Sequence, residues 1–242
     1  MPQAAIIIPA RYHSTRFPGK MLAELWGKPL VQHVWERCRQ ARQADHVIVA
    51  TDHPAIAAAA QAFGAEVVMT RSDHSSGTDR VAEVAANLSA DLIVNVQGDE
   101  PMVDPAHIDA AIAPLAADPA LPVGTLCCPL ERMEDLANPN VVKVVCDLRG
   151  NALYFSRLPI PFVRDHGAEA VRYRHIGLYV YRRDFLLRLA RLPPTPLELA
   201  ERLEQLRVLE HGHPIRVVMV EHTSPGVDTP ADLARLEAAG PG

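Results

Sequence analysis

The sequence has few cysteines, no long apolar run and no block of basic residues, and each absence excludes a class of protein. Its four cysteines show no zinc-binding or redox spacing, so we expect reduced thiols in a cytoplasmic protein. No apolar stretch approaches the roughly 18 residues that a membrane-spanning helix needs. The formal net charge of −5 argues against a nucleic-acid partner. Because Met1-Pro-Gln leads directly into an apolar stretch, we also expect no signal peptide.

Two common phosphate-binding loops are missing as well. A Walker A loop has a glycine five positions before its Gly-Lys pair and a hydroxyl residue after it. Around the Gly-Lys pair that ends at Lys20, this chain instead has Ser14 and Met21. It also has no Gly-x-Gly-x-x-Gly. The sequence therefore predicts neither a P-loop enzyme nor a nicotinamide-dinucleotide site.

The chain does contain regular alternation of apolar strands and amphipathic helices. The predicted strands cover residues 4–8, 46–51, 66–69, 91–96 and 123–130, and the predicted helices follow Pro29, cover 54–63, follow Thr78 and cover 105–117. This alternation predicts one Rossmann-like α/β domain over residues 1–242, with a mostly parallel sheet and helices on both faces. Beyond Asn140 the alternation stops. A hairpin of 141–145 and 152–155, followed by a proline-bearing segment, predicts an inserted strand-rich arm at about 140–183.

The loop Pro9–Lys20 is the first candidate site. It follows the first strand and carries Arg11, Arg16 and Lys20, with the Ser14 hydroxyl between them. Three cations and exposed backbone N–H groups suit a polyphosphate, which guanidinium groups bind in a bidentate manner. The alternative is a solvated basic loop.

A carboxylate follows the strand at 91–96, in the turn Gln97-Gly-Asp-Glu-Pro101. Ligands bind open α/β sheets at the carboxyl ends of the strands, so Asp99 and Arg11 should face one crevice. A carboxylate beside a polyphosphate requires a cation, and Mg²⁺ is held by one or two carboxylates plus phosphates. The alternative is that Asp99 is only a turn residue.

A third candidate lies around residues 70–80. Thr78 is predicted to be a helix N-cap, and Ser76 and Gly77 would let backbone groups approach a base edge. Arg80 in the first turn is poorly placed against the helix dipole unless an anion is near. The alternative is simply a well-capped helix.

These motifs resemble the sugar-acid cytidylyltransferases of the nucleotidyltransferase superfamily, in particular those that act on 3-deoxy-manno-octulosonate (Kdo). The resemblance runs from residue 4 to about residue 236. Two features depart from the family: Met21 replaces an expected proline, and the segment 163–172 is shorter than the family would have. The segments that carry it are Pro9–Lys20, Gln97–Pro101, Tyr154-Phe-Ser-Arg-x-Pro-Ile-Pro161, Arg174-His-Ile-Gly-x-Tyr179 and Val227-Asp-Thr-Pro230.

The resemblance implies a reaction and a set of site residues. CMP would pass from CTP to the anomeric hydroxyl of Kdo, activating it for lipopolysaccharide synthesis, in a homodimer that uses the arm. Asp99 and Asp228 would hold Mg²⁺ and, with Arg11 and Lys20, carry the catalysis. The implied nucleotide-binding residues are Ala10, Arg11, Ser14, Arg16, Lys20, Arg71, Ser76, Gly77, Thr78, Arg80 and Gln97, and the implied sugar-binding residues are Gln97, Arg157, His175, Tyr179, Glu204 and Gln205.

Several of these residues have plainer interpretations. The strand 173–181 alternates every second residue, so His175 and Tyr179 fit a half-exposed sheet face. Glu204 and Gln205 fit the solvated face of a helix predicted over 197–211. Asp228 fits a helix cap region. The alternative functions are a cytidylyltransferase for another sugar acid, such as 8-amino-Kdo or a sialic acid, and a non-catalytic nucleotide-sugar sensor.

Overall fold

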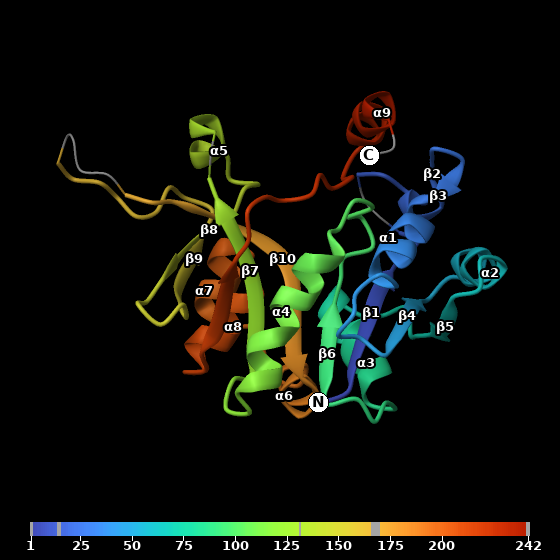
Figure 1. The fold of residues 1–242 in the computed structure, drawn as a ribbon, viewed down its shortest axis with the longest axis horizontal. Coiled ribbons are helices and arrows are strands. Elements are labelled where there is room, and N and C mark those ends of the chain that lie inside the picture. The colour runs from blue at the N-terminus through green and yellow to red at the C-terminus, as the bar shows by residue number, and fades with distance from the viewer. Residues whose placement is uncertain (1, 14–15, 131, 166–169, 241–242) are drawn as a thin grey trace.

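A twisted mixed sheet forms the centre of the computed structural model, which describes residues 2–13, 16–130, 132–165 and 170–240 (Figure 1). Along the sheet the strands follow the order β11-β7-β10-β6-β1-β4-β5. Their bounds are β1 Ala4–Ala10, β4 His46–Thr51, β5 Glu66–Met69, β6 Leu92–Asn95, β7 Val123–Pro129, β10 Tyr173–Arg182 and β11 Ile215–Met219. β1 pairs in parallel with both β4 and β6, and β11 pairs in parallel with β7. β10 is the exception, because it lies between β6 and β7 and runs antiparallel to both. The parallel pairings of the other main strands confirm the predicted mostly parallel sheet.

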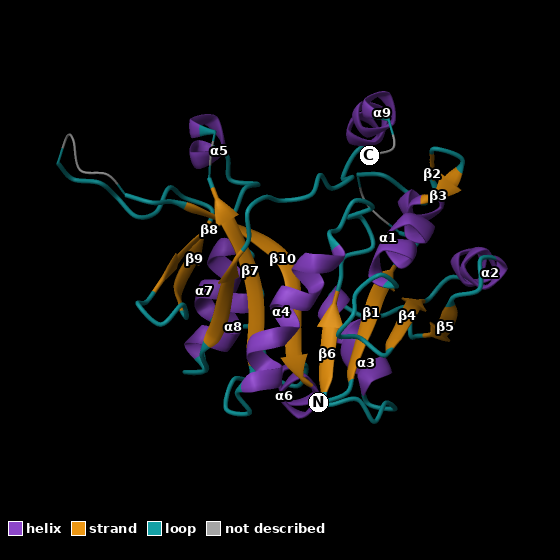
Figure 2. Cartoon of the chain, viewed as in Figure 1, coloured by secondary structure: helices purple, strands orange, loops and turns teal. Residues whose placement is uncertain are grey.

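Helices cover both faces of this sheet (Figure 2). Their bounds are α1 Leu30–Cys38, α2 Pro54–Ala62, α3 Gly77–Ala85, α4 Pro105–Ala117, α6 Arg183–Leu189 and α8 Gln205–Glu210. Ile6 and Ile8 of β1 share one buried cluster with residues of α1, α2 and α4. Ile7 points to the other face and shares a cluster with residues of α3, α6 and α8. The strand is therefore apolar throughout because both of its faces are buried. No helix in the described part of the chain is long and apolar enough to cross a bilayer.

The C-terminal helix α9 (Pro230–Ala239) packs against the segment that follows the first loop. A small cluster joins Leu236 of α9 and Val227 to Leu25, which lies in the short strand β2 (Glu24–Leu25) paired with β3 (Lys28–Pro29). Trp26 Nε1 also donates to the Glu237 carbonyl over 3.2 Å. As a result, the chain around residue 228 lies beside the short 3₁₀ helix η1 (Lys20–Leu22).

The predicted hairpin of the arm is confirmed. β8 (Lys143–Cys146) pairs antiparallel with β9 (Ala152–Ser156), and β8 also pairs with the first residues of β10. The buried ammonium group of Lys143 donates to the carbonyls of Asn138, Val141 and Arg157, over 3.1, 2.6 and 2.5 Å. Because β10 continues from this hairpin into the main sheet, the arm and the sheet share one strand. The short helix α5 (Met133–Ala137) precedes the hairpin.

The single helix predicted over residues 197–211 is wrong. The chain forms α7 (Pro196–Glu201) and, after a break, α8. Arg202 adopts a left-handed conformation with φ of 54°, which ends α7, and Leu199 of the predicted buried stripe is 55% exposed. Arg207 Nε donates to Glu198 Oε2 over 2.8 Å, and this buried ion pair ties the two helices together.

Candidate functional site

Three segments meet at the carboxyl edge of the parallel strands. They are the loop after β1, the turn after β6 and the segment 220–229 that connects β11 to α9, which we call the strap. The turn and the strap are joined where Val227 N donates to the Asp99 carbonyl over 2.8 Å. Gly98 allows the turn to approach the first loop, since a Cβ there would lie 2.9 Å from the Pro9 carbonyl oxygen. No specific pattern in the sequence indicated this close approach.

The charged groups on these segments converge on Lys20. Its Nζ lies 2.7 Å from Asp99 Oδ2 and 3.5 Å from Asp228 Oδ1, and Arg16 Nη2 lies 2.9 Å from the same Asp228 oxygen. The Lys20 side chain is only 6% exposed, whereas those of Asp99 and Asp228 are 32% and 52% exposed. Carboxylate oxygens of this kind are ligands that a divalent cation such as Mg²⁺ takes.

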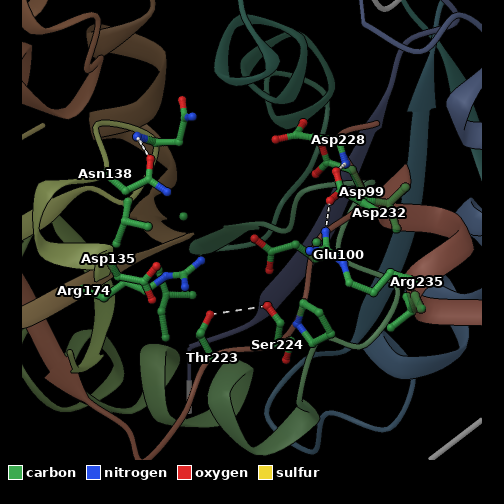
Figure 3. A pocket seen from close by; sticks show the side chains of 18 of the residues that line it. Asp99, Glu100, Asp135, Asn138, Arg174, Thr223, Ser224, Asp228, Asp232 and Arg235 are labelled. Carbon is green, nitrogen blue, oxygen red and sulfur yellow. Dashed lines mark hydrogen bonds and ion pairs between the residues drawn. The ribbon is translucent and has the colours of Figure 1, made fainter. Parts of the chain in front are cut away.

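Two cavities adjoin this charge cluster. A pocket of about 290 Å³ is lined by the first loop and the start of α3, and a cleft of about 770 Å³ is lined by the strap, α9 and the base of the arm. Asp99 and Asp228 line both cavities. Figure 3 shows Asp99, Glu100 and Asp228 on one side of the larger cleft and Asn138, Asp135 and Arg174 on the other. The two carboxylates therefore stand where a molecule in the pocket would meet one in the cleft.

Most residues expected to bind a nucleotide lie at the smaller pocket. Its lining includes Arg11, Arg16, Lys20, Ser76, Gly77, Arg80, Gln97 and Asp99. Ala10 is buried at the end of β1, and Ser14 lies outside the described residues. Arg71 faces elsewhere. Its side chain is 69% exposed beside Asp73 and lines a separate pocket along α3.

The start of α3 differs from the prediction. Ser76, not Thr78, is the N-cap, and its side chain and Asp79 form a capping box. The Thr78 hydroxyl instead faces inward and accepts from Asn95 Nδ2 over 3.5 Å. The Ser-x-x-Asp pattern from Ser76 to Asp79 was the signal that could have identified this cap.

Arg80 has a buried partner of its own. Its Nη2 donates to Asp52 Oδ2 over 3.1 Å, and its Nη1 donates to the hydroxyl of Thr70. The two side chains of the ion pair are 4% and 9% exposed. Because Asp52 already neutralises the guanidinium, Arg80 shapes the pocket wall and brings little unpaired charge to it. His74, which the sequence analysis did not single out, also lines the pocket and bonds to Glu83.

His175 lines the larger cleft, and its ring is held in place. Its Nε2 lies 2.9 Å from Thr125 Oγ1, and its ring packs edge-on against Phe155. Burial lowers the pKa of His175 to about 3, so the imidazole is neutral near neutral pH. β10 has a register irregularity between Ile176 and Tyr179, close to the histidine.

Three more of the predicted sugar residues, Gln97, Tyr179 and Glu204, lie in a polar layer near the α3 N-terminus. Gln97 Nε2 donates to Asn95 Oδ1 over 3.3 Å, and Tyr179 stands opposite Asn95 in the sheet. Burial raises the pKa of Glu204, and hydrogen bonds to Thr78 and Ser76 oppose that rise. Burial, and then the Glu204 charge, raise the pKa of Tyr179 well above its ordinary value. Gln205 is buried at 8% exposure.

Arg157 is engaged in structural bonds. Its Nε and Nη2 donate to the carbonyls of Glu201 and Arg202 over 2.6 and 3.1 Å, and its Nη1 donates to that of Pro139 over 2.8 Å. These bonds join the end of β9 to the end of α7. In this conformation the guanidinium supports the base of the arm rather than the lining of the cleft.

Glu100 is a cleft residue that the sequence analysis did not single out. Burial, and then the neighbouring Asp99 charge, raise its pKa to about 7, while Arg174 acts in the opposite direction. Arg132, Arg174 and Arg235 also line the cleft. Arg132 is paired with Glu134 and Arg235 with Asp232, so Arg174 is the guanidinium that we single out for a ligand that carries a carboxylate.

Comparison with known proteins gives matches over almost the whole chain. The profile of the cytidylyltransferase family matches residues 5–216. The 3-deoxy-manno-octulosonate cytidylyltransferase of Geobacter sulfurreducens is 57% identical, over 95% of this chain and 96% of that protein. The protein of the same name from Syntrophotalea carbinolica is 58% identical, over 96% of both chains. A solved structure of CMP:2-keto-3-deoxy-manno-octonic acid synthetase complexed with CTP superposes with a TM-score of 0.94, at 48% identity and 98% coverage of both chains.

Proposed function

The chain belongs to the cytidylyltransferase family, with relatives named 3-deoxy-manno-octulosonate cytidylyltransferases, and from this we propose that it transfers CMP from CTP to Kdo. The products are CMP-Kdo and pyrophosphate. The single observation that carries the proposal is the position of Asp99 and Asp228 where the pocket and the cleft meet. There a nucleotide α-phosphate in the pocket would face a sugar acid in the cleft.

In the proposed reaction, the anomeric 2-hydroxyl of Kdo attacks the α-phosphorus of CTP in line with the departing pyrophosphate. The new P–O bond forms as the bond to the β-phosphate oxygen breaks, and the hydroxyl proton passes to solvent. Arg11, Arg16 and Lys20 line the pocket and neutralise the phosphate charges. Catalysis of this kind depends chiefly on positioning and on charge stabilisation.

We propose that Asp99 and Asp228 hold Mg²⁺. The fit rests on the donor set, because both carboxylates approach the one Lys20 ammonium group and both remain partly exposed. Carboxylate oxygens plus substrate oxygens are the coordination that Mg²⁺ prefers. When bound, the ion supplies positive charge at the α-phosphate and lowers the pKa of the attacking hydroxyl. Lys20 keeps the two carboxylates together before the ion arrives.

The cleft supports a sugar acid as the second substrate. His175 is neutral and fixed by Thr125, so it offers a hydrogen bond to a sugar hydroxyl without adding charge. Arg174 lines the same cleft and provides a cation for the carboxylate of the sugar acid. Tyr179 packs beside the His175 ring, and Glu204 lies near Thr78 and Ser76 at the start of α3. Direct contact of Tyr179, Glu204 and Gln205 with the sugar remains a prediction.

We also propose a homodimer formed through the arm. Three of its large apolar side chains are exposed, with Leu153 at 62%, Leu158 at 69% and Phe162 at 87%. The segment after β9 extends away from the body of the molecule (Figure 1). A second copy of the chain would remove this apolar surface from water.

A pyrophosphate-release assay across Kdo, 8-amino-Kdo and a sialic acid tests the function. We expect turnover with CTP and Kdo that exceeds turnover with the other two acceptors. Preferred use of another acceptor would indicate a different sugar-acid cytidylyltransferase. Binding of CTP without turnover of any acceptor would identify a sensor and overturn the proposal.

A further inference from the structure

Outside the site described above, two histidines and one aspartate face one another beside the strap. His107 Nε2 and His222 Nε2 lie 3.9 and 3.7 Å from the same oxygen, Asp104 Oδ2. The two imidazole centroids are 4.8 Å apart. One ligand atom from each residue can be chosen so that all three lie within 4.8 Å of one another.

These spacings suit an ion better than a direct hydrogen bond. Both nitrogen–oxygen distances are longer than a normal hydrogen bond, whose donor–acceptor distance is at most about 3.2 Å. In a tetrahedral site with metal–ligand bonds of about 2.0–2.1 Å, neighbouring ligand atoms lie about 3.3 Å apart. A contraction of about half an ångström in each nitrogen–oxygen distance, and of at most about 1.5 Å between the two ring nitrogens, would therefore bring the three ligand atoms around one ion.

The carboxylate and the inner imidazole are already positioned. Asp104 is the N-cap of α4, and its Oδ1 accepts from Ala106 N over 2.8 Å, which leaves Oδ2 for the histidines. His107 lies in the first turn of α4 with its side chain 11% exposed. A histidine binds a metal through an unprotonated ring nitrogen, and the Nε2 atom of His107 faces Asp104 Oδ2.

We propose that Asp104, His107 and His222 form a site for a divalent transition metal of the Zn²⁺ class. Imidazole and carboxylate ligands suit Zn²⁺, Co²⁺ and Ni²⁺, whereas Mg²⁺ prefers oxygen ligands throughout. The His222 side chain is 61% exposed, so solvent has access and a water molecule completes the coordination. The site is separate from the proposed Mg²⁺ ligands.

Such a metal would join the two segments that carry the paired carboxylates. Asp104 follows the turn that bears Asp99, and His222 lies in the strap that bears Asp228. The segments already share the bond from Val227 N to the Asp99 carbonyl. The metal adds a second link at the other end of the strap and stabilises the folded state by binding it preferentially.

The test uses the full chain, stripped with a chelator and kept in excess Mg²⁺ so that the paired carboxylates are occupied. Zn²⁺ binding is measured by calorimetry, and the visible absorption of Co²⁺ reports ring-nitrogen ligation. At ten times its dissociation constant, Zn²⁺ should raise the melting temperature by about 3–5 °C. Absence of a bound Co²⁺ spectrum overturns the proposal.

Two variants assign the ligands. His222→Ala removes an exposed side chain, and Asp104→Asn removes the charge while keeping an efficient N-cap. Each should weaken Zn²⁺ binding at least about a hundredfold, since second-shell losses alone cost about 10–100-fold. The matched control is His211→Ala, which changes an exposed histidine elsewhere. An unchanged affinity in His222→Ala, or an equal loss in His211→Ala, overturns the assignment.

Discussion

Asp99 and Asp228 lie on segments far apart in the chain, yet both approach the ammonium group of Lys20, at 2.7 and 3.5 Å. Lys20 is nearly buried between them, so each carboxylate is held by an ion pair and by the fold of its own segment. A metal that replaced part of the lysine contact would find both ligands already in place. This relationship makes the two aspartates the most informative residues to change.

Asp99→Asn should reduce turnover by about a hundredfold to a thousandfold or more, the usual cost of losing one electrostatic stabiliser from an active site. The amide keeps the shape of the side chain but loses the charge that attracts Mg²⁺. Pyrophosphate release at saturating CTP and varied Mg²⁺ measures the effect. Asp228→Asn should act in the same direction and less strongly, because its side chain is more exposed.

The control for this change is Asp184→Asn, which alters a carboxylate that is 89% exposed on α6. A thermal melt of each variant separates lost chemistry from lost structure. The expected loss leaves about a hundredth of wild-type activity or less. If the folded Asp99→Asn variant keeps more than about a tenth of wild-type activity, Asp99 does not hold the metal.

Gly77→Ala should raise KM for CTP and leave KM for Kdo nearly unchanged. The added Cβ would lie 3.5 Å from Pro9 Cγ and 4.0 Å from Gln97 Oε1, which are ordinary contacts, so the fold should tolerate it. It would nevertheless narrow the pocket in which we place the cytidine. Steady-state kinetics with each substrate varied in turn measures the change. Equal effects on both KM values would contradict this placement of the nucleotide.

His175→Ala should weaken the use of Kdo while leaving CTP affinity nearly intact. Loss of one buried polar contact costs about 1–3 kcal/mol, which corresponds to a rise of about 5–150-fold in KM for Kdo. Phe155→Leu is the matched control, because it disturbs the packing against the same ring without removing the polar group. An unchanged dependence on Kdo would leave β10 with a structural role only.

The same histidine should make stability depend on pH. Since burial lowers the pKa of His175 to about 3, the unfolded chain takes up a proton below about pH 6.5 while the folded chain does not. The stabilising contribution is therefore complete above pH 6.5 and is lost as the pH falls toward 3. Glu100, whose pKa is raised from 4.5 to about 7, acts in the opposite direction. Its stabilising contribution is complete below pH 4.5 and is lost as the pH rises toward 7.

A comparison of variants isolates the histidine. The free energy of unfolding of His175→Gln, measured by urea denaturation between pH 7 and pH 5, should fall less steeply with acidification than that of the wild type. The contribution of Glu100 cancels in the difference. Parallel curves for the two proteins would show that His175 is not buried as a neutral ring.

Phe162→Ser together with Leu158→Ser should convert the expected dimer into a monomer. Both side chains are exposed on the arm, and each serine removes apolar surface that a second copy would cover. Sedimentation at micromolar concentration measures the assembly. Leu199→Ser, at a position 55% exposed on α7, is the control and should leave the assembly unchanged. A monomeric wild type would refute the proposed dimer.

The fold was predictable wherever local pattern and burial agreed. The apolar run after Gln3 and the turn at Gln97–Pro101 predicted parallel strands whose loops share one edge, and Lys20 and Asp99 do meet there. The helix at 197–211 was not predictable in the same way. Its leucine spacing continues past Arg202, whose left-handed conformation ends α7, and the ion pair between Glu198 and Arg207 then joins the two helices.

The contact partners of the site residues were harder to predict from the sequence than the residues themselves. Arg80 is neutralised by Asp52, and Arg157 binds backbone carbonyls around α7. Neither relationship leaves a local signal, because each joins segments that are distant in sequence. The sequence identified residue types suited to the chemistry, and the three-dimensional contacts decided how much unpaired charge each brings to the site.

The position of β10 has a consequence for how the chain folds. β6 and β7 follow one another in sequence but are not neighbours in the sheet, because residues 173–182 lie between them. A growing chain can pair β1, β4, β5 and β6 early, whereas β7 must wait until the whole arm has been synthesised. Such long-range pairing slows folding and leaves strand edges exposed in the meantime. The arm therefore sets the moment at which the two halves of the sheet can first close into one.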